Sequence, residues 1–129
     1  MLDGEVLTPR QQDEINRAID IAQRESGLSF TVYVGPPTGD PRAFARKLLA
    51  ALPDPEQSAV VVVDPTQRRL EIVTGRVAAR NLDDRACMLA TASMTSAFAA
   101  GDLSGGIASG IVLLGEQARH PRSLHLDNP

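Results

Sequence analysis

Ala59-Val-Val-Val-Val63 is the most apolar run of this chain, and Arg69-Leu-Glu-Ile-Val-Thr74 follows it after a short turn. An unbroken run of short apolar residues is typical of a strand that is covered on both faces of a sheet. In the second segment, Leu70 and Ile72 share one face, opposite charged residues, which is the pattern of a half-buried strand. Asp64-Pro-Thr-Gln67 between the two has the chemistry of a type I turn. We therefore predict an antiparallel hairpin whose first strand is central.

A strand and a helix are predicted before this hairpin. Phe30-Thr-Val-Tyr-Val-Gly35 consists of β-branched and aromatic residues and ends in a turn cluster, which favours a strand. Asp40 is placed to cap a helix that begins at Pro41 and stops at Pro53. Because a strand-helix-strand crossover is right-handed and joins parallel strands, the first two strands should be parallel.

The first helix of the chain is marked at both ends. Thr8-Pro-Arg-Gln11 is a capping box with proline at the first helical position, and Gly27 supplies a left-handed end. The residues between them place an apolar residue every third or fourth position, at Ile15, Ala18, Ile19 and Ala22.

Two helices are predicted after the hairpin. One runs from about Asp83 to Ala100, and the next starts near Asp102 or Ser104. The second has an apolar face made of Leu103, Ile107, Ile111, Leu114 and Ala118. It also carries a small-residue surface at Gly106 and Gly110, which predicts close approach to the sheet or to a neighbouring helix. The preceding helix has a matching small surface at Ala86, Ala90, Ser93 and Ala97.

The order helix-strand-helix-strand-strand-helix-helix predicts an α/β fold with a small mixed sheet and helices on both faces. We expect residues 1–119 to form one domain, because no linker divides them and 129 residues is a one-domain length. Residues 120–129 contain two prolines and no periodic pattern, so a flexible C-terminal tail is predicted.

Charge, hydropathy and cysteine count limit the classes of protein to which this chain can belong. A net charge of −3 at pH 7 gives the chain no general attraction to nucleic acid. No apolar run reaches the roughly 18 residues that a membrane-spanning helix needs. The N-terminus lacks the pattern of a signal peptide, so a cytoplasmic location is expected. One cysteine, Cys87, excludes an intramolecular disulfide.

The order of elements resembles the TPM domain family, over Gln11 to Ala118. The resemblance is carried by the first strand, by the hairpin that ends in Gly75, by Leu82-Asp-Asp84, and by Phe98 with Gly101-Asp102. It implies the fold derived above. The roles linked to that family are photosystem repair, weak acid phosphatase activity, calcium binding and assistance to a membrane receptor.

The chain also departs from that family. Glu56-Gln-Ser58 stands where the family often has Asp-Asn-Gly, and Val77-Ala-Ala79 stands in place of Gly-Leu-Glu. Asp84 alone retains the family's acidic pattern. Such a sequence resembles a divergent, actinobacterial branch that is a domain of unknown function.

Asp84, Arg76 and Asp40 are the candidate binding residues, and no catalytic or metal-ligating residue is predicted. Asp40 closes a loop between a strand and a helix, where α/β folds often bind ligands, but three prolines there remove N–H donors and favour an ordinary capped turn. Arg76 belongs to a group of arginines near the third strand. They either bind an acidic partner or form a solvated face offset by Glu71, Asp83 and Asp84. Its other members are Arg68, Arg69, Arg80 and Arg85.

Two further groups of residues bear on metal binding and on nucleophilic catalysis. Asp83, Asp84, Glu56 and Asp64 are oxygen ligands that a cation could use, but helix caps and a turn explain most of them. Cys87 has no nearby histidine in sequence, because His120 and His125 lie in the predicted tail. A structural thiol is therefore favoured over a cysteine nucleophile, and no cofactor is expected.

The sequence leads to two functional hypotheses. The first is a non-catalytic accessory or interaction domain with an unknown protein partner, since no complete catalytic constellation is present. The alternative is a weak metal-assisted acid phosphatase, which only the family resemblance implies.

Overall fold

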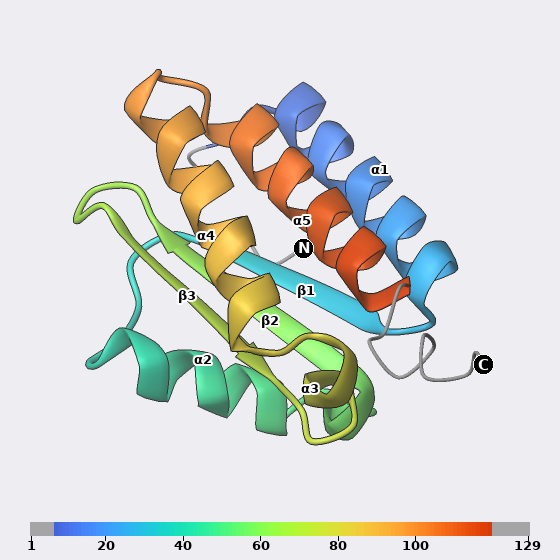
Figure 1. Ribbon diagram of the computed structural model, residues 1–129. Coiled ribbons are helices and arrows are strands. Elements are labelled where there is room, and N and C mark those ends of the chain that lie inside the picture. Colours follow the sequence, from blue (N-terminus) through green and yellow to red (C-terminus); the bar gives the residue numbers. More distant parts are fainter. Residues whose placement is uncertain (1–6, 120–129) are drawn as a thin grey trace.

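Strand β2 (Ser58–Asp64) lies at the centre of a three-stranded sheet in the computed structural model, which describes residues 7–119 (Figure 1). It pairs in parallel with β1 (Ser29–Val34) and in antiparallel with β3 (Arg69–Thr74). Val61 lies opposite Val32 on one side and Ile72 on the other. Every residue of β2 is buried, so the predicted central strand is confirmed.

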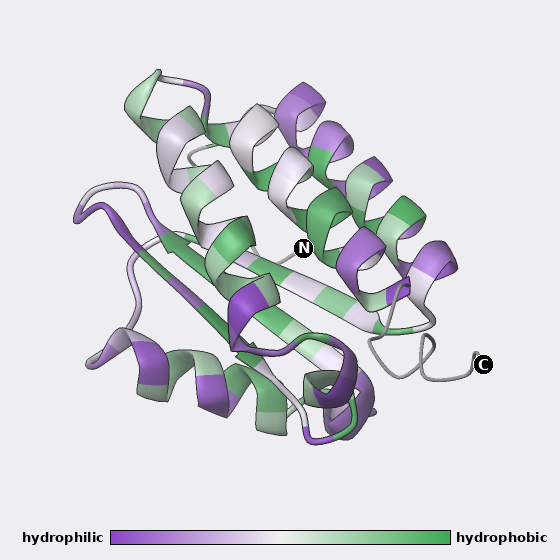
Figure 2. Cartoon of the chain, in the orientation of Figure 1, coloured by the Kyte–Doolittle hydropathy of each residue, from purple (hydrophilic) through white to green (hydrophobic). Residues whose placement is uncertain are grey.

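Helices cover both faces of this sheet. Helices α1 (Pro9–Ser26), α4 (Asp84–Ala99) and α5 (Leu103–Arg119) lie on one face, and α2 (Pro41–Ala50) lies on the other (Figure 1). The larger core cluster joins α1, α4 and α5 to the sheet and includes Val61, Ile72 and Leu114. The smaller cluster lies under α2 and consists of Ala45, Val60, Val62 and Val73. Figure 2 shows the hydrophobic residues gathered on the strands and on α5, and hydrophilic residues on the outer turns of α1.

The local signals at the helix starts are confirmed. The Thr8 hydroxyl accepts from the Gln11 N–H at 3.2 Å, and the Gln11 side chain accepts from the Thr8 N–H at 2.9 Å, which completes the capping box. Gly27 ends α1 with φ of 78°, in the left-handed region. Asp40 and Asp83 cap α2 and α4 through the N–H groups of Ala43 and Ala86, both at 2.9 Å.

Two short elements were not predicted. A 3₁₀ turn, η1 (Pro55–Gln57), precedes β2, and the short helix α3 (Ala78–Asn81) follows β3. They contact one another: the Val77 N–H donates to the Glu56 carbonyl at 2.9 Å, and a side chain at Gly75 would collide with the backbone of η1. This close approach explains the glycine at the end of β3.

The small-residue surface of α5 meets two neighbouring helices. A Cβ atom added at Gly106 would lie 2.7 Å from the Ala97 Cβ of α4, and one added at Gly115 would lie 2.7 Å from the Ala22 Cα of α1. Both distances are too short for real contacts, so these glycines permit the close packing that the sequence predicted. Within residues 7–119, no helix is both long and apolar enough to cross a membrane. The predicted flexible tail, residues 120–129, lies outside the described residues.

Candidate functional site

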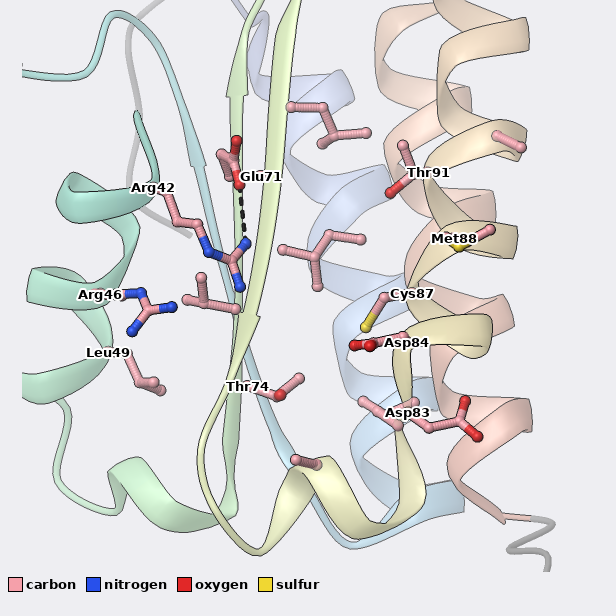
Figure 3. A pocket seen from close by; sticks show the side chains of 16 residues that line it. Arg42, Arg46, Leu49, Glu71, Thr74, Asp83, Asp84, Cys87, Met88 and Thr91 are labelled. Atoms are coloured by element: carbon pink, nitrogen blue, oxygen red, sulfur yellow. Dashed lines mark hydrogen bonds and ion pairs between the residues drawn. The ribbon is translucent and has the colours of Figure 1, made fainter. Parts of the chain in front are cut away.

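A groove of about 870 Å³ runs along the outer edge of β3, between α2 and the first turns of α4 (Figure 3). Its floor is β3 itself. Helix α2 contributes one wall through Arg42, Arg46 and Leu49, and α4 contributes the other through residues that include Asp84, Cys87, Met88 and Thr91. The short helix α3 contributes Ala79, so the groove joins four elements, β3, α2, α3 and α4.

The edge of β3 that faces the groove carries unpaired backbone groups. The Gly75 N–H donates to the Ser58 carbonyl at 2.8 Å, which fixes the hydrogen-bonding phase of the ladder. Because the pattern alternates in an antiparallel pair, Glu71 and Val73 exchange bonds with β2, and the N–H and C=O groups of Leu70, Ile72 and Thr74 point outward. In the stretch from Leu7 to Arg119, no hydrogen bond joins these outward groups to another element.

The wall formed by α2 is basic. Arg42 forms an ion pair with Glu71 at 3.1 Å, with both side chains partly exposed (Figure 3). Arg46, one helical turn later, also lines the groove, and no carboxylate of the described residues lies within ion-pair distance of it. One guanidinium is thus neutralised by the sheet and the other is left facing the groove.

The wall formed by α4 is mostly apolar and is acidic at the N-terminus of the helix. Met88 is 68% exposed, the most exposed large apolar side chain of the described part of the chain. Cys87 lies beside it, half-buried, and Asp84 lies at the start of the helix. Burial raises the pKa of the Cys87 thiol, and the nearby carboxylates of Asp84 and Asp83 raise it further. A raised thiol pKa makes Cys87 a poor nucleophile, because the thiolate is the reactive form.

The three predicted binding residues do not share one pocket. Asp84 lines the groove. Asp40 caps α2 and is not among the groove's lining residues. Arg76 lies outside the groove, where it forms an exposed ion pair with Glu56 at 3.0 Å.

The arginines that cluster in the sequence are dispersed in the fold. Arg68 lies at a shallow cavity near the β2–β3 turn, Arg76 pairs with η1, and Arg80 and Arg85 line a separate small cavity beside Asp83. Sequence reasoning missed Arg42 and Arg46. Their spacing of four places both on one side of α2, which was a readable signal. Their position opposite α4 depends on tertiary packing.

Asp83 and Asp84 both line the groove, but the other acidic candidates for a cation lie elsewhere, and three of the four have partners of their own. The Asp64 side chain is buried and accepts from the Gln67 N–H at 3.3 Å, Asp83 caps α4, and Glu56 pairs with Arg76. Among residues 7–119, no three His, Cys, Asp or Glu side chains are grouped so that they could hold a metal ion.

Comparison with known proteins gives a family and a fold. A family described as "Domain of unknown function (DUF5130)" matches residues 6–115. Two uncharacterized proteins of Mycobacterium tuberculosis, Rv2468c of strain H37Rv and MT2543 of strain CDC 1551, are each 30% identical over 100 residues, or 78% of this chain. The chain spans 60% of the length of these curated relatives.

Three solved structures have the same fold. The BA42 protein of Bizionia argentinensis matches 88% of this chain and 82% of its own, with a TM-score of 0.78 and 17% identity. The N-terminal domain of the cg2496 protein of Corynebacterium glutamicum matches 91% of this chain and 78% of its own, with a TM-score of 0.75 and 16% identity. The N-terminal domain of a P. gingivalis protein matches 90% and 80%, with a TM-score of 0.72 and 18% identity. At these identities the likeness shows the fold alone.

Proposed function

Since the chain belongs to the family described as a domain of unknown function, DUF5130, we propose its function from its own surface: it is a non-catalytic interaction domain that binds another protein. The observation that carries the proposal is the groove along β3. Within residues 7–119, it places unpaired backbone groups, a guanidinium without a carboxylate partner and an exposed apolar side chain on one concave surface. These are groups that a polypeptide ligand satisfies.

A proline on the edge of β3 tests whether this groove binds polypeptides. In Thr74→Pro, one outward N–H is lost and the β2–β3 ladder is kept, because proline is tolerated on an edge strand whose N–H faces away from the sheet. Thr74→Val is the matched control, since it keeps the N–H and nearly the same shape. Thr74 lines the groove and lies opposite Ala59 in the ladder.

The measurement is selection of displayed random peptides on the wild-type protein, followed by affinity measurement on both variants. We expect selected peptides to shift the NMR signals of groove residues, to keep their affinity for Thr74→Val and to lose about tenfold for Thr74→Pro. A selection that enriches no peptide at the groove would contradict the interaction-domain proposal.

The alternative function is a weak metal-assisted acid phosphatase. One observation favours it: Arg42 and Arg46 lie on the wall opposite Asp84, so the groove holds both phosphate-binding and acidic groups. Under our proposal, the purified protein should show no turnover of an aryl phosphate above background, with or without calcium or magnesium. Metal-dependent turnover that is lost in identically prepared Asp84→Asn would instead support the phosphatase.

We also propose that this family is a divergent, actinobacterial branch of the TPM domains. The order of elements and the short motifs in the sequence support the relation to TPM domains. The Mycobacterium tuberculosis relatives support only the actinobacterial part of the proposal. A sequence profile built from many members of both families would test it: a continuous series of intermediates is expected, and two separated groups would oppose it.

A further inference from the structure

We propose that the groove binds an extended peptide that adds to β3 as a fourth strand and alternates acidic with apolar side chains. This inference rests on the proposed interaction function and adds the conformation and the chemistry of the ligand. It is carried by the free edge of β3 and by the different character of the two walls.

The conformation follows from the unpaired backbone groups. Leu70, Ile72 and Thr74 present N–H and C=O groups at alternate positions along the edge, which is the pattern that an added strand pairs with. The strand has six residues, so the edge is about 20 Å long at the usual rise per residue. A helix or a compact loop would leave most of these groups without partners.

The α2 wall selects acidic side chains. Neighbouring strands point directly opposite residues to the same face, so ligand residues opposite Glu71 and Val73 point toward α2. Figure 3 shows Arg42 and Arg46 on this side of β3. Of the two, only Arg42 has a carboxylate partner in the described part of the chain, Glu71. A ligand carboxylate at this face is therefore placed to pair with the guanidinium of Arg46.

The α4 wall selects apolar side chains. Ligand residues opposite Leu70 and Ile72 point toward Cys87 and Met88. Covering Met88 would remove from water an apolar side chain that is 68% exposed in the free protein. Asp84 on the same wall repels an acidic side chain. The two walls together require that charge and apolar character alternate along the ligand.

A second copy of this chain fits the groove less well than a single strand does. Its own β3 has alternating residues, but it is flanked by the same two helices. When two sheets join edge to edge, the α2 helices of both copies lie on the same face, so the second copy brings another basic wall where the groove favours a carboxylate. The occupant is therefore a segment that carries acidic side chains at that face.

The probes are three terminally blocked hexapeptides, titrated into the ¹⁵N-labelled full chain and followed by backbone NMR shifts up to about 1 mM, the weak end of specific binding. Glu-Val-Glu-Val-Glu-Val has the proposed pattern. Glu-Glu-Glu-Val-Val-Val has the same composition without alternation, and Lys-Val-Lys-Val-Lys-Val has the opposite charge. The first should shift the signals of β3 and of both walls and bind about fivefold more tightly than either of the others.

Two further experiments test the backbone hydrogen bonding of the peptide and the charge preference of the α2 wall. N-methylation at every valine or at every glutamate blocks one edge of the peptide, and one of the two sets should cost more than tenfold in affinity. Arg46→Glu should reverse the preference toward the lysine peptide. Lys47→Glu makes the same charge change at the next, exposed residue, which does not line the groove, and should leave the preference unchanged.

The outcomes separate this inference from the proposed function. Groove shifts that are indifferent to alternation, or equal effects of the two methylated sets, would overturn the strand-addition inference and leave an interaction groove. Absence of groove shifts with all three peptides would also overturn it, and the display selection then decides the function independently. A concentration-dependent dimer whose interface shifts map to β3 would replace the peptide with a second copy.

Discussion

At the scale of single residues, the reactivity of the Cys87 thiol is a probe of the groove wall that it lines. Burial and the carboxylates of Asp84 and Asp83 raise its thiol pKa, so less thiolate is present at a given pH in the folded protein than in the unfolded chain. Below the ordinary thiol pKa, both the folded and the unfolded state keep the proton, and the thiol adds no pH dependence to stability. Above it, the unfolded chain ionises first, so the free energy of unfolding falls as the pH rises.

We predict that Cys87 reacts with an alkylating reagent at pH 8 roughly tenfold more slowly in the folded protein than in denaturant. Asp84→Asn should raise the folded rate severalfold, because it removes one of the causes of the raised pKa. Mass spectrometry of timed samples measures both rates. A folded rate equal to the denatured rate would mean that the thiol is not shielded.

At the scale of elements, the sequence predicted what local chemistry controls. The capping box at Thr8, the cap at Asp40 and the alternation of β3 each act within a few residues, so their effects were readable. The short helix α3 was missed because its four residues have no cap or period of their own. Its position depends on contact with η1 across the hairpin.

The candidate site was less predictable than the elements that form it. Asp84 was identified, but its neighbours in the groove come from α2 and β3, and no local pattern indicates which helix lies beside which edge. Arg76 was favoured on its position in a basic stretch, and its partner proved to be Glu56 in η1. The missing information was tertiary packing.

The central strand gives one prediction at this scale. Val62→Asp should prevent folding, because Val62 is 1% exposed within the cluster under α2 and an unpaired carboxylate there cannot be solvated. Thr66→Asp, in the exposed turn after the same strand, should fold normally. Circular dichroism and a urea titration of both variants provide the test, and a cooperative transition in Val62→Asp would show that the strand has a solvated face.

The contact between α1 and α5 gives a second prediction about stability. Gly115→Ala should destabilise the protein by about 1–3 kcal/mol, because the new methyl group would overlap the backbone of Ala22 and force the two helices apart. This is opposite in sign to the roughly 1 kcal/mol gain that alanine usually brings to a helix interior. Ser109→Ala, at an exposed position of α5, is the control. Equilibrium urea unfolding would contradict the prediction if Gly115→Ala were as stable as the wild type.

At the scale of the whole molecule, the two sides of the sheet are unequal. Three helices and the larger core cluster lie on one side, whereas α2 alone covers the other over a cluster of four buried residues. Cooperative units with little buried apolar surface open at lower free energy than the rest of a protein. The helix that forms one wall of the groove is thus the least supported long helix of the described fold.

Native-state hydrogen exchange should show that α2 opens more easily than α1 and α5. We predict that amides in the middle of α2 exchange through openings that cost less free energy than the openings that expose α1 and α5. The measurement is NMR-detected exchange at low denaturant concentrations. If α2 were protected as strongly as α1, the layers would unfold as one unit and the groove wall would not move independently.

The pairing of α1 with α5 also has a consequence for synthesis on the ribosome. The apolar stripe of α1 emerges first, and the four consecutive valines of β2 follow. Helix α5, which packs against Ala22, is the last of the described helices to be made. A growing chain therefore carries an apolar helix and a strongly β-prone segment whose packing is incomplete until α5 has been translated. Such segments are recognised by chaperones and are prone to aggregate when they wait. The order of the elements along the chain therefore delays completion of this fold until α5 has left the exit tunnel.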